Sequence, residues 1–198
     1  MGLVRAKDQN LYTYGDYRKW TDEKRYELID GLAYAMSPAP WVDHQRIAGA
    51  IYAKLVAAVV GKRCEAMIAP LDVRLPHNQE PDDLIDVVVQ PDVLVVCDPS
   101  KIDAKGVRGA PDLVVEVLSP STASHDQIRK RRVYERAGVR EFWLVHPTDR
   151  VITIYRLQNG VYGAPDVQEL VGVTPVGILP GVEMVWDELI ERLGPIED

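Results

Sequence analysis

Apolar residues recur along the chain at two spacings, one typical of strands and one typical of helices. Residues 26–37 hold two apolar runs separated by Asp30-Gly31, a pair typical of a tight β-hairpin. Residues 44–60 are expected to form a helix capped by Asp43, because apolar residues recur there at helical spacing: Ile47, Ile51, Leu55 and Ala58. The first third of the chain is therefore predicted to contain a hairpin followed by a helix.

Further apolar runs predict a set of strands. The alternating segment 67–75 contains Pro70, which cannot donate a backbone hydrogen bond, so an edge or bulged strand is expected there. Residues 86–96 and 111–119 are strongly apolar and are expected to form two central strands joined by a polar segment. The remaining elements are expected at residues 121–138 (helix), 141–146 and 151–157 (strands) and 186–193 (helix). This order is typical of an α/β (α+β) domain with a mixed, partly antiparallel central sheet.

The length and composition fit one soluble globular domain. The 198 residues suffice for a sizeable core, and we expect a loose leader over residues 1–10 followed by a single domain over residues 11–198. No apolar stretch approaches the roughly 18 residues of a membrane span, and the first ten residues lack the apolar segment of a secretory signal. We therefore expect a cytoplasmic protein. Cys64 and Cys97 follow no metal-ligand spacing and could form one bridge, but a reduced pair is the expected state in that compartment.

The net charge limits how the protein could hold a nucleic acid. The formal net charge is −7 and the sequence pI is about 5.1, which argues against a broad basic surface that binds nucleic acid by charge alone. A local basic groove is compatible with this charge, and so is a site where metal ions offset acidic side chains.

Glu116 is unusual because it lies in the middle of a strongly apolar strand, where an ionised carboxylate needs compensation. If the strands 86–96 and 111–119 pair antiparallel about residue 104, position i faces position 208 − i, and Asp92 lies opposite Glu116. Opposite side chains on one face have Cβ atoms about 4.5–5.5 Å apart. Two carboxylates so placed repel each other, and a divalent cation such as Mg²⁺ between them would remove the conflict. The long connection need not be symmetric, but any shift that preserves parity keeps both acids on one face.

The helix at 121–138 is expected to bring a lysine to these acids. One stripe of this helix carries residues at helical spacing: Asp126, Lys130, Val133, Tyr134 and Ala137. Its apolar members should face the sheet, which would direct Lys130 toward the carboxylates. The alternative is that the run "RKRR" (129–132) is a solvated helix face, or contacts a phosphate backbone.

A "PD" on one strand, an acid in an apolar run on the next and a nearby lysine together resemble the PD-(D/E)XK nuclease superfamily. More closely, the chain resembles the bacterial Uma family of predicted restriction endonucleases, over nearly its whole length. The matching segments occur in the same order and spacing: "YELIDGLAYAMSPAPWVDH" (26–44), "QPDVLVV" (90–96), "PDLVVEVLSPST" (111–122), Asp126 and Lys130, "YERAGVREFWLVHP" (134–147) and "LPGVEM" (179–184).

This resemblance implies a restriction-endonuclease-like fold and an endonuclease that hydrolyses phosphodiester bonds with Mg²⁺, or Mn²⁺, as its cofactor. DNA is the expected substrate, and a homodimer is expected because many nucleases of this fold cut two strands as dimers. Carried over residue by residue, Asp92 and Glu116 are the metal-binding acids, and the backbone carbonyl of Val117 is a further metal ligand.

The resemblance also implies two further catalytic residues. The usual lysine two positions after the acid is missing, because Leu118 stands there, and Lys130 from the following helix is expected to replace it. Glu27, in "YELIDG", matches an acid of the family that is expected near the same site.

Other interpretations stay open at this point. Glu116 could pair with an arginine of the 129–132 run, Glu27 could pair only across its hairpin, and His44 could be a surface residue near a helix start. The whole protein could be a catalytically inactive nuclease-fold module that binds nucleic acid or protein, or a metal phosphoesterase that acts on a smaller substrate.

Overall fold

Two β-sheets form the frame of the protein in a computed structural model that describes residues 8–21, 24–36, 41–119, 123–191 and 193. The six-stranded small sheet has the order β2 (Leu32–Ala35), β1 (Tyr26–Ile29), β5 (Val88–Val89), β4 (Val73–Arg74), β8 (Gly106–Arg108), β7 (Ile102–Asp103). The seven-stranded large sheet has the order β12 (Val161–Tyr162), β11 (Val151–Gln158), β10 (Glu141–His146), β9 (Leu113–Val117), β6 (Val93–Val96), β3 (Glu65–Ile68), and β13 (Asp166–Glu169) pairs with β11. A separate pair joins β14 (Val173–Pro175) to β15 (Glu183–Val185).

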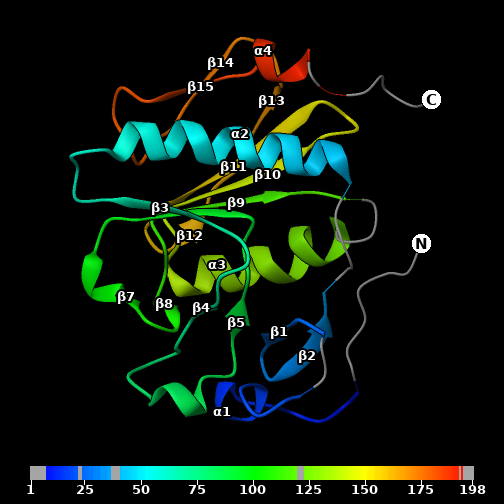
Figure 1. Cartoon of the computed structure of the whole chain (residues 1–198), viewed down its shortest axis with the longest axis vertical. Coiled ribbons are helices and arrows are strands. Elements are labelled where there is room, and N and C mark those ends of the chain that lie inside the picture. The colour runs from blue at the N-terminus through cyan, green and yellow to red at the C-terminus, as the bar shows by residue number, and fades with distance from the viewer. Residues whose placement is uncertain (1–7, 22–23, 37–40, 120–122, 192, 194–198) are drawn as a thin grey trace.

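Helices cover both faces of the large sheet (Figure 1). Helix α2 (Val42–Val59) lies on one face, and the other face is covered by a π-helical turn (His125–Lys130) that continues into α3 (Arg131–Ala137). The short helices are α1 (Tyr14–Tyr17), α4 (Asp187–Ile190) and two 3₁₀ turns, η1 (Asp82–Leu84) and η2 (Pro99–Lys101). Within the described residues, no helix combines the length and apolar character that a bilayer crossing needs.

Strand parity decides which core each side chain joins. The odd positions of β6 and β9, such as Val95 and Val115, pack with α2 in one apolar core. The even positions, such as Leu94 and Val114, pack with α3 and with small-sheet strands in a second core, which we call the inter-sheet core. Glu116 has even parity, so its side chain belongs to the layer between the two sheets.

The structure confirms the N-terminal hairpin and alters the start of the helix that follows. Ile29 pairs with Leu32, and Asp30 and Gly31 both have positive φ (50° and 79°), as a type I′ turn requires. The expectation that Asp43 caps the helix is wrong, because α2 begins at Val42 and Asp43 lies in its first turn.

Two of the expected strands are each divided between the two sheets. Segment 67–75 contributes β3 to the large sheet and β4 to the small sheet, and segment 86–96 contributes β5 and β6 in the same way. Pro70 and Pro91 stand at the two crossings, where the missing N–H ends the ladder. The crossings lie side by side, because the Ala69 N–H donates to the carbonyl of Asp92 (3.0 Å). The expected polar connection after residue 96 also holds the short strands β7 and β8.

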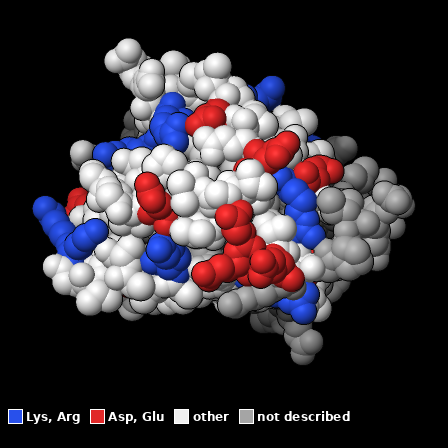
Figure 2. Space-filling view, turned by 90° about the horizontal axis from the view of Figure 1, so that it is seen from above, with Lys and Arg blue, Asp and Glu red and all other residues white. Residues whose placement is uncertain are grey.

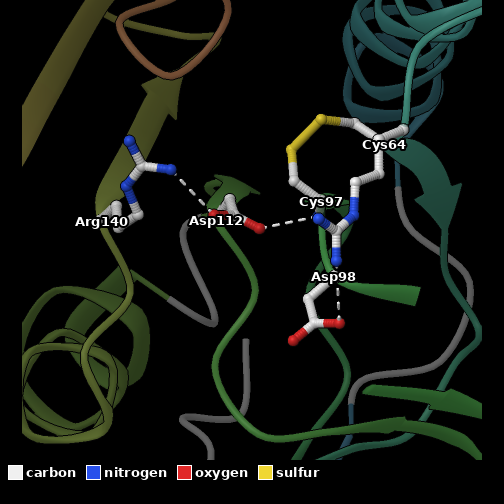
Figure 3. The surroundings of a disulfide bond; sticks show 6 residues. Cys64, Cys97, Asp98, Asp112 and Arg140 are labelled. Carbon is white, nitrogen blue, oxygen red and sulfur yellow. Dashed lines mark hydrogen bonds and ion pairs between the residues drawn. A yellow bond between two sulfur atoms is a disulfide. The ribbon is translucent and has the colours of Figure 1, made fainter. Parts of the chain in front are cut away.

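A disulfide joins Cys64 to Cys97, contrary to the expectation of a reduced pair (Figure 3). The two cysteines adjoin β3 and β6, which pair antiparallel, so their positions face each other across the end of the ladder. Asp112 supports the same end, since it accepts a hydrogen bond from the Cys97 N–H (2.7 Å) and pairs with Arg140 (3.0 Å). Asp112 therefore has a structural role at the start of β9.

A buried arginine forms ion pairs near the β7 edge of the small sheet. The Arg74 side chain is fully buried and forms ion pairs with Asp82 and with Asp103 (2.7 Å). Asp82 also pairs with Lys105 (3.2 Å) and Arg108 (2.9 Å). Burial opposes ionisation of Asp82, but its hydrogen bonds with Lys105 and Arg108 and the charge of Arg74 outweigh that effect and lower its pKa.

Replacing Asp82 by Asn should lower the free energy of unfolding by about 2–3 kcal/mol at pH 7, because a buried guanidinium loses a partner. A carboxyl with a depressed pKa stabilises the fold above its unfolded pKa, and this contribution is lost as pH falls through its folded pKa. The difference in the free energy of unfolding between wild type and variant should therefore become smaller at acidic pH. Urea unfolding at pH 7 and pH 3.5 measures it, with Asp83→Asn as the control, because that side chain is 69% exposed. Equal losses in both variants would contradict this view of Arg74.

Candidate active site

Lys130 is the centre of a buried cluster of charges between the two sheets. Its ammonium contacts the carboxylates of Glu27 (2.9 Å), Glu116 (3.0 Å) and Asp126 (3.2 Å). Burial alone would lower the pKa of Lys130, but these carboxylates outweigh burial and raise it well above its ordinary value. Lys130 is therefore charged, and it links β1, β9 and the π-helical turn.

The placement of Lys130 follows from the predicted helix stripe. Val133 and Tyr134 are buried in the inter-sheet core, and Lys130 lies on the same side of the helix. The backbone from His125 to Lys130 is π-helical, a wide turn that often occurs at functional sites. The alternative of a solvated lysine is wrong, whereas the neighbouring Arg129 and Arg132 are exposed.

Glu116 has two partners on one of its oxygens. Its Oε1 accepts hydrogen bonds from Lys130 Nζ (3.0 Å) and from the Tyr134 hydroxyl (2.6 Å). Burial is the main cause that raises the pKa of Glu116 well above its ordinary value, since the attraction of Lys130 is opposed by the charges of Asp126, Asp92 and Glu27. The cluster therefore holds more negative charge than Lys130 compensates, and a cation or a proton would stabilise it. The alternative partner, an arginine of the 129–132 run, does not occupy this position.

Glu27 reaches the cluster from the small sheet. Its Oε1 contacts Lys130 and accepts the Gln90 N–H (2.9 Å), and its Oε2 lies 3.1 Å from His125 Nε2. Burial opposes ionisation, but Lys130, His125 and the Gln90 N–H together lower the pKa of Glu27 to about 2. Glu27 is thus an ionised anchor for Lys130, and its partners lie well beyond its own hairpin.

Asp92 lies where the chain enters the large sheet, directly before β6. The antiparallel register of β6 and β9 pairs Val93 with Val115. The two residue numbers add up to 208, as the predicted symmetric register requires. One step further, this register brings Asp92 opposite Glu116. Asp92 Oδ2 accepts the Val117 N–H (2.8 Å), so the carboxylate continues the ladder that Pro91 interrupts. The Asp92 side chain is 21% exposed, which makes it the accessible edge of the cluster.

Two histidines complete the site, and sequence reasoning did not assign either of them. His44 Nε2 lies 3.1 Å from Asp92 Oδ2, and His125 Nε2 contacts Glu27. The signal for His44 was its place three residues before Ile47, on the apolar stripe of α2. His125 carries no comparable signal, because only the packing of β1 against the π-helical turn places it on Glu27.

Comparisons with known proteins show the family to which the chain belongs. A family model described as "Putative restriction endonuclease" matches residues 14–187. The chain belongs to this family, Uma2. An uncharacterized protein of Synechocystis sp. is 30% identical to the chain over 143 residues, which are 71% of each protein.

A solved structure gives independent support for the fold of this Uma2 protein. A protein of Anabaena variabilis, described as a putative nuclease belonging to DUF820, superposes with a TM-score of 0.71 at 20% identity. The superposition covers 90% of this chain and 97% of the other. The expected restriction-endonuclease-like fold is thus confirmed, and membership in Uma2 supports a nuclease.

Leu118 stands two residues after Glu116, and its surroundings are apolar. Its side chain is 6% exposed and packs in the inter-sheet core beside Val133 and Tyr134. A lysine at this position would bury its charge among apolar side chains. Leu118 and Glu116 have the same parity, and Lys130 reaches Glu116 from the helical segment that covers this face of the large sheet.

Replacing Lys130 by Met should lower the free energy of unfolding by about 3–5 kcal/mol at pH 8, because the buried carboxylates lose their common cation. The pKa values of these carboxylates should then rise, so protonation relieves the repulsion and the loss becomes smaller at pH 5. Urea unfolding at both pH values measures the effect. Arg132→Met is the matched control, since Arg132 is exposed on the same helix. A loss that is equal at pH 5 and pH 8 would show that Lys130 does not balance these acids.

Proposed function

We propose that this Uma2 protein is a divalent-metal-dependent endonuclease that cleaves DNA, with Asp92 and Glu116 as its metal-binding acids. The observation that carries the proposal is the gathering of carboxylates around Lys130: Glu27, Glu116 and Asp126 contact one ammonium, and the charge of Asp92 acts on Glu116 as well. A cation at the exposed edge of the cluster would balance this charge.

The oxygen atoms at this edge fit Mg²⁺ or Mn²⁺. His44 and the Val117 N–H contact Asp92 through Oδ2, and Lys130 and Tyr134 contact Glu116 through Oε1. Among the described residues, none donates a hydrogen bond to Asp92 Oδ1 or Glu116 Oε2. The N–H and C=O of a strand residue point to the same side, so the Val117 carbonyl is directed toward Asp92 as its N–H is. These atoms are hard oxygen donors.

The small number of protein ligands also suits Mg²⁺. The described ranges contain no group of three or more His, Cys, Asp or Glu side chains arranged for a metal ion. Two carboxylates and one carbonyl leave positions for water and for phosphate oxygens, and Mg²⁺ is commonly bound in this way.

The protein's own residues would orient the reaction. A divalent cation bound here would supply activation of water and neutralisation of the phosphate charge. Lys130 and Tyr134 hold Glu116 Oε1, so Oε2 would be the oxygen that binds the cation. Lys130 is the proposed catalytic lysine, because its charge lies beside the carboxylate at which water and phosphate would bind. Glu27 acts through Lys130, which its Oε1 contacts, while His125 contacts the other oxygen of Glu27.

The distribution of charge suggests how DNA would approach. On the face that carries α2 and α4, several acidic side chains are gathered together, the basic side chains are scattered, and no broad basic area is seen (Figure 2). With a net charge of −7, we expect DNA to be held by local contacts and by the cation. A homodimer would supply two such sites, one for each strand of a duplex.

Titration of the purified protein with Mn²⁺, followed by calorimetry, should show binding that Asp92→Asn and Glu116→Gln each weaken by at least ~100-fold, more than the loss of an outer partner would cause. The same variants should lose cleavage of plasmid DNA in Mg²⁺. Glu65→Gln is the control, because Glu65 is exposed on β3 of the same sheet. It should bind and cleave as wild type does.

The alternative function is a nuclease fold without catalysis that binds nucleic acid or protein. It is favoured by the near-complete burial of Glu116 and Lys130, whose side chains are 3% and 5% exposed. Absence of Mn²⁺ binding by wild type would overturn the metal site, and binding without cleavage of DNA would favour the inactive module.

A further inference from the structure

We propose that His44 is a positioning residue, whose Nε2–H holds Asp92 Oδ2 so that Asp92 Oδ1 is directed to the metal. This inference rests on the proposed function, and it assigns a task to a residue in the first turn of α2. The observation behind it is the contact of 3.1 Å between His44 Nε2 and Asp92 Oδ2.

Two donors from different elements fix this carboxylate. The Val117 N–H approaches Oδ2 from β9 (2.8 Å), and His44 approaches the same oxygen from α2. Two donors on one oxygen restrict rotation of the carboxylate about its Cβ–Cγ bond more than one donor would. The side chains of His44 and Asp92 are 12% and 21% exposed, so water competes little for this hydrogen bond.

Helix α2 is a rigid support for His44. Ile47 and Ile51 follow it at i+3 and i+7, and both are fully buried against the large sheet. The ring therefore has a fixed height above the sheet, set by the packing of an 18-residue helix. A site built on such an element is held more accurately than one built on a loop.

The stability of the fold does not account for His44. Its Nδ1 is buried and has no hydrogen-bond partner among the described residues. In a neutral imidazole whose Nε2 donates to a carboxylate, Nδ1 is an acceptor. An unpaired buried acceptor destabilises the fold. The Nε2 end of the ring, and hence Asp92, is the reason that a histidine fits this position.

Two amide side chains separate the proposed role from simple packing. A glutamine places its amide nitrogen near the position of Nε2, whereas an asparagine reaches only the position of Nδ1. Loss of a residue that orients a metal ligand typically weakens metal binding by about 10–100-fold, which is the change expected for His44→Asn and His44→Ala. His44→Gln should bind Mn²⁺ much as wild type does. Gln45→Ala, exposed in the same turn, is the control.

Calorimetric titration with Mn²⁺ and thermal unfolding should be recorded for each variant. The inference is overturned if His44→Asn binds Mn²⁺ as tightly as wild type, while the metal site itself then stands. It is also overturned if the glutamine variant loses affinity in proportion to its loss of stability, as a packing role would require. If wild type binds no Mn²⁺, the proposed function fails, and the inference fails with it.

A second measurement needs no metal. Proton–nitrogen NMR of the metal-free protein should show His44 with its proton on Nε2, and Asp92→Asn should shift the Nε2 resonance. A neutral ring with its proton on Nδ1 would overturn the hydrogen bond on which the inference depends.

Discussion

The ion pairs of Lys130 are the constraint on which the arrangement of the two sheets depends. One ammonium contacts carboxylates from the small sheet, the large sheet and its own helical turn. In an apolar layer none of these charges could remain alone, because an uncompensated buried charge costs several kcal/mol. The sheets must therefore approach closely enough for Glu27 and Glu116 to share the same cation. The inter-sheet core fills the space around them with apolar side chains.

The two proline crossings explain why the cluster has an open edge. At Pro91 the chain leaves the small sheet and enters the large one, so Asp92 lies just before the regular ladder of β6 begins. Its carboxylate accepts the Val117 N–H, a place that a backbone carbonyl would otherwise fill. The same break in the ladder leaves Asp92 partly exposed while Glu116 stays buried. The break in the ladder at Pro91 thus places a partly exposed acid, Asp92, beside a buried one, Glu116.

Local pattern predicted much of this site, and packing decided the rest. Parity and the symmetric register placed Asp92 opposite Glu116, and the helix stripe directed Lys130 inward, because both depend only on spacing along one element. The apolar pattern did not show that segments 67–75 and 86–96 change sheets, since a buried strand looks the same in either sheet. The disulfide and the contacts of His44 and His125 join residues far apart in sequence. Such contacts depend on how elements pack, which periodicity does not describe.

The long reach of these contacts has a consequence for how the protein is made. Glu27 and His125 are 98 positions apart, and the residues of the cluster come from nearly the whole span between them. Contacts of such separation require the closure of large loops, which slows folding. The charges cannot be balanced in a nascent chain that lacks the helix after β9. A ribosome-bound fragment would thus carry unmatched acids, and the site would appear only once most of the chain has been synthesised.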